Sequence, residues 1–180
     1  MWCTIRNKKI GILGYGHIGR FIAKYLKAYD CHITGFRRNI SAGNDEFADE
    51  ISNKLSDVIA KSDILFNVLP LNTETKHIIN AEILSKMRGK YIISVGRGET
   101  IQEEPLYNAL KDNILAGAAL DVWYNYPGKK EEPVYPSNFP FWELPNVLLS
   151  PHKSSHTTEA VNAMIDDTCN NIRKFISSNK

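Results

Sequence analysis

The sequence predicts an α/β fold: a doubly wound parallel sheet of about six strands in a three-layer αβα arrangement. Short runs that are apolar on both faces, such as residues 10–13 and 91–95, alternate with stretches of helical periodicity. Strands of this kind are typical of parallel sheets that helices cover on both faces. The glycine spacing Gly14, Gly16 and Gly19 after the first run indicates a strand, a tight turn and a helix in succession.

The first half of the sheet is expected between a polar lead-in, residues 1–8, and the strand that Pro70 closes. The helix that opens near His17 is expected to pack on the sheet, because apolar residues recur along it at helical spacing. No element is assigned to the polar residues 39–53. The apolar stripe comprises Phe21, Ile22, Tyr25, Leu26 and Tyr29; the strands are 10–13, 32–36 and 63–69, and the second helix is 55–61.

The second half continues the alternation of helices and strands. Gly89 is a helix stop signal, and Pro105 stands in a first helical turn, where proline is tolerated. Residues 124–145 carry five prolines and are expected to form a loop long enough to be functional. Helices are expected at 81–88, 103–111 and 159–176, and strands at 91–95, 116–122 and 147–150.

Composition excludes several classes of protein. The 180 residues suit one sizeable α/β domain, and their net charge of +2 is interspersed, so nucleic acid and membrane surfaces are not expected partners. Cys3, Cys31 and Cys169 are odd in number and far apart, which indicates reduced thiols and a cytoplasmic setting. The cysteines show no metal-ligand spacing, so no metal site is expected. No signal peptide or long apolar span is present, so secretion and membrane insertion are not expected.

The strand ends carry the residues with the most chemistry. Ligands of doubly wound sheets bind beyond the carboxyl ends of the strands, and phosphates sit at the N-terminus of the first helix. The first glycine of such a loop permits the turn, the second lets backbone approach a pyrophosphate, and the third allows close packing. One sheet edge is therefore expected to hold Gly14 to Gly19, Arg37, Pro70, Arg97, Asp121 and His152.

With these residues aligned, the chain resembles the cofactor domain of the D-isomer-specific 2-hydroxyacid dehydrogenases, a Rossmann-type fold. The motifs are GYGHIG, LPLNTETKHIIN, VGRGETIQEEPL, AALDVW and NVLLSPHKSSHTTEA, in this order. The resemblance implies a homodimer that transfers a hydride between NADP or NAD and a small 2-oxo or 2-hydroxy acid. The cofactor-binding positions that it implies are Gly14, Tyr15, Gly16, His17, Ile18, Gly19, Arg37, Arg38, Leu69, Pro70, Thr75, Val95, Gly96, Arg97, Asp121, His152 and Ser154.

The resemblance also implies an incomplete architecture. Residues 1–150 correspond to the NAD(P)-binding domain, and residues 151–180 to a helix that in the family returns to the substrate lobe. The N-terminal substrate lobe itself is expected to be absent, so that the chain is a fragment, works with a lobe from another chain, or only binds nucleotide.

Arg97 and His152 fall on two of the family's three catalytic positions. Reduction of a 2-oxo acid needs the acid oriented, its carbonyl polarised and a proton delivered. A planar guanidinium can grip a carboxylate and a carbonyl oxygen, which suits Arg97. Imidazole titrates near neutral pH, which suits His152 as the acid and base.

The third position departs from the family, because Tyr126 stands where the glutamate is found. A carboxylate beside imidazole raises the imidazole pKa, whereas a neutral phenol shares only a hydrogen bond. Any reductase activity is therefore expected to decline at a lower pH than in relatives that keep the carboxylate. Glu131 or Glu132 is an alternative source of the charge.

Two further positions bear on the cofactor. An NAD site wants an acid about 20 positions after the glycine loop, yet the second strand ends in Arg37 and Arg38, which favours the 2′-phosphate of NADP. Asp121 either orients the nicotinamide carboxamide, as the family implies, or caps the loop that follows it.

Two other functions stay open. A non-catalytic nucleotide-binding or interaction module fits Tyr126 and the missing lobe, although Arg97 and His152 are retained. Formate-type oxidation fits the neutral residue at position 126.

Overall fold

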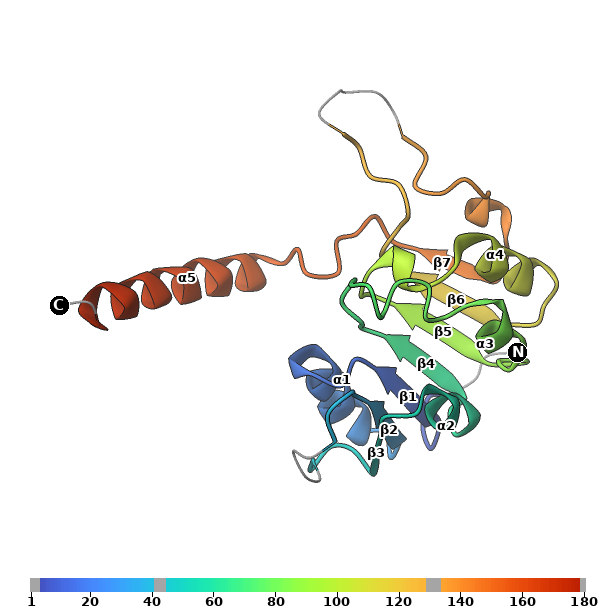
Figure 1. Cartoon of the computed structure of the whole chain (residues 1–180), viewed down its shortest axis with the longest axis horizontal. Helices are drawn as coiled ribbons and strands as arrows, with labels where there is room; N and C mark the ends of the chain where they lie inside the picture. The colour runs from blue at the N-terminus through green and yellow to red at the C-terminus, as the bar shows by residue number, and fades with distance from the viewer. Residues whose placement is uncertain (1–3, 41–44, 129–133, 179–180) are drawn as a thin grey trace.

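Seven parallel strands form one sheet in the order β3-β2-β1-β4-β5-β6-β7 (Figure 1). The computed structural model describes residues 4–40, 45–128 and 134–178. The chain enters the sheet at β1, adds β2 and β3 on one side of it, and then adds β4 to β7 on the other side. The strands are β1 Lys9–Leu13, β2 His32–Phe36, β3 Glu50–Ser52, β4 Ile64–Asn67, β5 Tyr91–Ser94, β6 Gly117–Leu120 and β7 Val147–Leu149.

Helices lie on both faces of the sheet, which confirms the doubly wound α/β prediction. The helix α1 packs on β1 and β2 from one face, while α2, α3 and α4 share a core cluster on the other. Right-handed crossovers require this split, because the chain moves in opposite directions from β1 before and after β3. The helices are α1 His17–Lys27, α2 Leu55–Ala60, α3 Ala81–Ser85, α4 Glu103–Lys111 and α5 Thr158–Ser178.

The strand β1 contributes to both layers of the core. Ile10 and Ile12 are fully buried against α1, and Leu13 is fully buried in the cluster on the other face. Alternation of side chains along a strand makes this possible, since neighbours point to opposite faces. The apolar run in the sequence therefore corresponds to a strand that is covered twice.

Three sequence predictions are corrected. The sheet has seven strands, not about six, because residues 50–52 of the unassigned segment pair with β2. The helix α3 ends at Ser85 rather than at residue 88. The buried face of α1 is made by Gly19, Ala23 and Leu26, whereas the aromatic members of the predicted stripe, Phe21, Tyr25 and Tyr29, are exposed.

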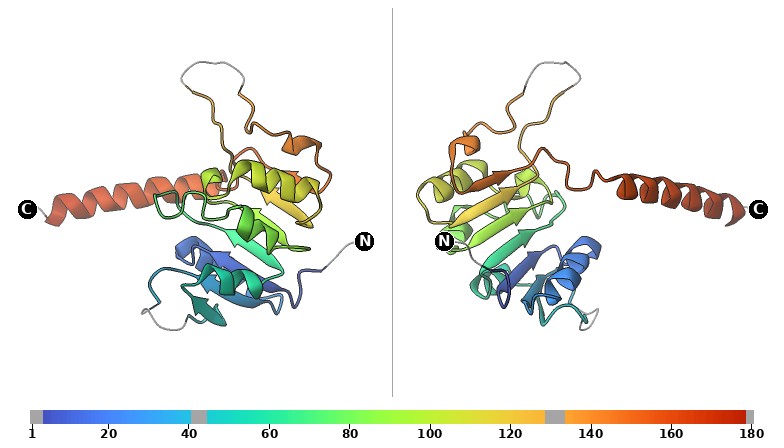
Figure 2. Two further views of the ribbon diagram at one scale, coloured as in Figure 1. Left: turned by 45° about the vertical axis from the view of Figure 1, so that its right-hand side comes forward. Right: turned by 180° about the vertical axis from the view of Figure 1, so that it is seen from behind.

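Helices do not cover both faces along the whole sheet. On the α1 face, the half formed by β4 to β7 borders a hollow of about 680 Å³, where Tyr91 and Leu148 are exposed. The helix α5 extends away from the sheet, and none of its described residues is buried (Figures 1 and 2). Its apolar residues Val161, Met164 and Ile165 are accordingly exposed. In the described ranges, no helix combines the length and apolar character of a membrane span.

Candidate functional site

The glycine loop between β1 and α1 is shaped by three different steric demands. Gly14 has φ of +90°, and a Cβ there would lie 2.9 Å from the Val68 carbonyl oxygen. A Cβ on Gly19 would lie 2.8 Å from the Gly14 carbonyl oxygen, so this glycine lets α1 approach β1 closely. A Cβ on Gly16 would meet nothing within 4 Å. The first and third glycines thus serve the fold, and the second leaves open space.

That open space faces the start of α1. The first N–H groups of a helix have no partner within it and carry its positive partial charge. Gly16 is the N-cap residue, no side chain caps the helix, and no acid stands in the first turn. The loop therefore fits a pyrophosphate, because its donors are uncompensated and no Cβ would fill the cradle.

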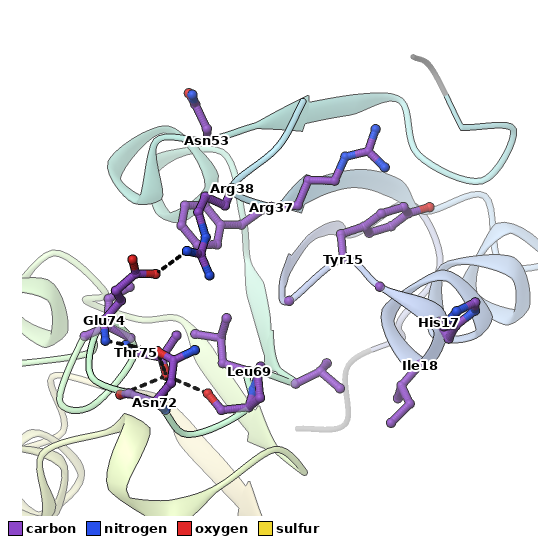
Figure 3. A pocket seen from close by; sticks show the side chains of 16 residues that line it. Tyr15, His17, Ile18, Arg37, Arg38, Asn53, Leu69, Asn72, Glu74 and Thr75 are labelled. Carbon is purple, nitrogen blue, oxygen red and sulfur yellow. Dashed lines mark hydrogen bonds and ion pairs between the residues drawn. The ribbon is translucent and has the colours of Figure 1, made fainter. Parts of the chain in front are cut away.

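A pocket of about 650 Å³ opens beside this loop (Figure 3). Its walls come from the glycine loop, the end of β2 and the segment after β4. The pocket brings together ten of the predicted cofactor residues: Gly14, Tyr15, Gly16, His17, Ile18, Arg37, Arg38, Leu69, Pro70 and Thr75. Six further residues were not predicted from the sequence: Phe36, Asn53, Val68, Asn72, Glu74 and Ile78. Asn72, Glu74 and Ile78 belong to the LPLNTETKHIIN motif, so the motif could have indicated these three residues from the sequence.

Tyr15 is a fixed wall of the pocket. Its hydroxyl donates to Asp45 Oδ1 at 2.9 Å, and Arg20 Nε donates to Asp45 Oδ2 at 2.6 Å. Burial, together with the Asp45 hydrogen bond, raises the pKa of the Tyr15 phenol, so the group stays neutral. Its ring lies so close to Gly35 that a Cβ there would be 2.6 Å from it. Tyr15 thus anchors the glycine loop to the chain beyond β2.

Arg97 lies at the end of β5 on a tightly packed loop. A Cβ on Gly96 would lie 2.6 Å from the Leu69 carbonyl oxygen, and one on Gly98 would collide with the Trp123 carbonyl. These glycines are therefore needed for close packing, because a side chain at either position would overlap backbone of a neighbouring segment. The N–H groups of Val95 and Gly96 both donate to the Asn67 carbonyl, at 3.1 and 3.0 Å.

The Arg97 side chain is exposed beyond this loop. Its Nη1 donates to the Gly96 carbonyl at 2.7 Å, and its backbone is extended. Contact with Leu69 on one side and Trp123 on the other places the loop between the pocket wall and the end of β6.

Asp121 holds the segment that carries His152. Its buried carboxylate accepts from the Ser150 hydroxyl at 2.5 Å and from the backbone N–H groups of Lys153 and Ser154 at 2.9 and 3.1 Å. Burial opposes ionisation, but these hydrogen bonds outweigh it and lower the pKa of Asp121 to about 2. These hydrogen bonds join Asp121 to the segment after β7. The capping alternative had instead predicted bonds to the loop that directly follows Asp121.

The substitution Asp121→Asn is expected to lower the free energy of unfolding by about 2 kcal/mol at pH 7, the equivalent of the fall in pKa from 3.8 to about 2. A lowered pKa stabilises the fold above the ordinary pKa, and this stabilisation is lost as pH falls through the folded value. The difference should therefore shrink to about half by pH 3. Urea unfolding at both pH values measures it, with the exposed Asp112→Asn as control; equal losses at both pH values would contradict the assignment.

His152 and Tyr126 lie beside each other. Their ring centroids are 5.4 Å apart, and His152 has φ of +56°, a left-handed backbone conformation that is uncommon for residues other than glycine. The Tyr126 hydroxyl accepts the Trp123 N–H at 3.0 Å, and Trp123 Nε1 donates to the Ser150 carbonyl at 2.8 Å. These hydrogen bonds connect the ends of β6 and β7 next to His152.

The predicted residues therefore form two groups at one edge of the sheet. The pocket beside the glycine loop lies at the ends of β1, β2 and β4. A second group, made of Asp121, Tyr126, His152 and Ser154, lies at the ends of β6 and β7. The Arg97 loop joins them. Glu131 and Glu132 lie outside the described residues, and the described residues hold no cluster of side chains suited to a metal ion.

Comparisons with known proteins bear on the fold and on the family of the chain. The family described as D-isomer specific 2-hydroxyacid dehydrogenase, NAD binding domain, matches residues 1–154. Glyoxylate/hydroxypyruvate reductase A HPR2 of Arabidopsis thaliana is 35% identical over 172 residues, which are 95% of this chain and 51% of that protein.

Two solved structures are similar over almost the whole of this chain. The NADPH-dependent glyoxylate/hydroxypyruvate reductase of Sinorhizobium meliloti, in complex with NADP and malonate, superposes with a TM-score of 0.80 at 31% identity, over 97% of this chain and 51% of that one. An acyclic imino acid reductase in complex with NADPH and D-Arg has a TM-score of 0.84 at 29% identity, over 98% and 54%. The chain thus spans about half the length of the relatives that it matches.

Proposed function

The chain belongs to the D-isomer specific 2-hydroxyacid dehydrogenase family, matching its NAD-binding domain, and we propose that it is the cofactor half of an NADP-preferring oxidoreductase acting on small 2-oxo or 2-hydroxy acids. One observation carries the proposal: the cradle at Gly16 opens into a pocket that also holds Arg37 and Arg38. Phosphate oxygens would find N–H donors at one end and guanidinium groups at the other.

The arginines support NADP over NAD. Both stand directly after β2, where an acid would accept a hydrogen bond from the ribose 2′-hydroxyl of NAD. Arg37 lies beside Tyr15, and Arg38 reaches toward the segment after β4 (Figure 3). Guanidinium groups at this point suit a 2′-phosphate. The two solved relatives named above were crystallised with NADPH or NADP.

The chemistry assigned to the chain follows from Arg97 and His152. The nicotinamide cofactor supplies a hydride to the carbonyl carbon of the substrate. Arg97, at the end of β5, is proposed to bind the carboxylate and polarise the carbonyl. His152 is proposed to give the proton to the carbonyl oxygen and to take it back in the reverse direction. Asp121 holds the His152 segment in place through the bonds to Ser150, Lys153 and Ser154.

The rest of the cleft is proposed to come from a substrate lobe outside residues 1–150. The helix α5, with its exposed apolar residues, is the element proposed to pack against that lobe. A homodimer in the cytoplasm completes the proposal. The described thiols, buried Cys31 and exposed Cys169, are both free, as expected in a reducing compartment.

NADPH is expected to bind this chain at least about tenfold more tightly than NADH, because one charge-assisted hydrogen bond to a phosphate accounts for about that ratio. Fluorescence titration of the purified chain with each dinucleotide measures the ratio. Replacing both arginines, Arg37→Ala with Arg38→Ala, should abolish the preference for NADPH. Tighter binding of NADH by the unsubstituted chain would contradict the NADP preference.

A second candidate function is a non-catalytic nucleotide-binding module. Two points support it: the resemblance assigns Tyr126 to the position of the family's glutamate, and the chain spans about half the length of its relatives. Turnover, not binding, separates the two candidates.

A further inference from the structure

The cofactor pocket contains an acid that faces the proposed phosphate site. Glu74 is the one acidic side chain among the described residues that line the pocket. Its Oε2 lies 2.8 Å from Arg38 Nη1, so an ion pair joins the end of β2 to the segment after β4 (Figure 3). The sequence lacked an acid at the end of β2, and the tertiary structure brings one to that place from the other wall.

The backbone at Glu74 is held by a compact hydrogen-bonded turn. Asn72 Oδ1 accepts the N–H groups of Glu74 and Thr75, each at 2.9 Å. The buried Thr75 hydroxyl donates to the Pro70 carbonyl at 2.6 Å and accepts the Asn72 N–H at 2.9 Å. These hydrogen bonds fix the backbone at Glu74, and therefore the position from which its side chain extends into the pocket.

The ion pair itself is easily exchanged. The side chains of Arg38 and Glu74 are 77% and 60% exposed, and exposed pairs contribute little to stability. A dianionic phosphate is a stronger partner for a guanidinium than a single carboxylate. A 2′-phosphate can therefore displace Glu74 from Arg38, at the cost of repulsion between the two anions.

We propose that Glu74 is a specificity-determining residue that lets this site accept both dinucleotides. With NAD, the Glu74 carboxylate accepts a hydrogen bond from the ribose 2′-hydroxyl, the role that an acid after β2 has in NAD sites. With NADP, Arg38 leaves Glu74 and binds the 2′-phosphate, and the carboxylate repels that phosphate. Glu74 thus weakens the NADP preference that Arg37 and Arg38 create. The inference rests on the proposed function, since it concerns the same pocket.

The test is titration of the purified chain with NADPH and NADH. Glu74→Gln keeps the size of the side chain but removes its charge. It is expected to tighten NADPH binding about threefold to tenfold and to weaken NADH binding about threefold, so that the ratio of affinities rises about tenfold or more. Glu99→Gln is the matched control, because Glu99 pairs with Lys76 at 3.5 Å in an exposed ion pair outside the pocket lining.

Each outcome bears on a different claim. A rise in the NADPH to NADH ratio in Glu74→Gln but not in Glu99→Gln supports the inference. A ratio that stays within twofold of the unsubstituted chain in both variants overturns it while leaving the proposed function intact. Failure of the unsubstituted chain to bind either dinucleotide overturns both.

Discussion

Gly16→Ala is expected to weaken dinucleotide binding about a hundredfold while changing the free energy of unfolding by no more than about 1 kcal/mol. A Cβ at this position meets no atom of the chain within 4 Å, so the fold tolerates it. The same Cβ would stand where the pyrophosphate approaches the backbone, and the loss of about two charge-assisted hydrogen bonds accounts for the hundredfold effect.

Two glycine variants make this prediction specific. Gly19→Ala should lower stability, because its Cβ would lie 2.8 Å from the Gly14 carbonyl oxygen. Gly128→Ala should change neither property, since its Cβ meets nothing and its φ is not positive. NADPH titration and urea unfolding of all three variants separate binding from stability. A Gly16→Ala chain that binds NADPH normally would remove this loop from the cofactor site.

Arg97→Ala is expected to lower the rate of any 2-oxo acid reduction by the chain at least about a hundredfold. A guanidinium that binds both the carboxylate and the carbonyl oxygen contributes to substrate binding and to turnover. The rate of the unsubstituted chain should itself be low, since catalysis depends on positioning and the chain spans about half of the relatives' length. NADPH oxidation with glyoxylate, hydroxypyruvate and larger 2-oxo acids measures it, and formate with NADP tests the formate-type alternative.

The same assay distinguishes the second candidate function. A chain that binds NADPH but reduces no acid of the panel favours the non-catalytic module. Where reduction is found, the pH–rate profile of Tyr126→Glu should extend to higher pH, because a carboxylate beside His152 raises the imidazole pKa. Identical profiles would show that the residue at position 126 does not set the protonation of His152.

Local patterns were sufficient for most of the fold. The runs at residues 10–13, 32–36 and 91–95 became strands close to their predicted limits, because burial on both faces leaves an uninterrupted apolar signature. The three residues of β3 were missed, because so short an edge strand lies in polar sequence and is defined by pairing with β2. The apolar spacing on α1 predicted the wrong buried face. Tyr25 is 70% exposed, while the small Ala23 is buried, because only small side chains fit where the helix lies close to the sheet.

The glycine loop, the arginines after β2, and the positions of Arg97 and His152 at strand ends could be predicted from the sequence, because each depends on residues that are near neighbours along the chain. The contacts of Asp121, the close packing at Gly96 and Gly98, and the ion pair of Glu74 with Arg38 became known from the folded structure. Each of these contacts joins segments that are distant along the chain. Their partners are chosen by the register and order of the strands, which no local periodicity encodes.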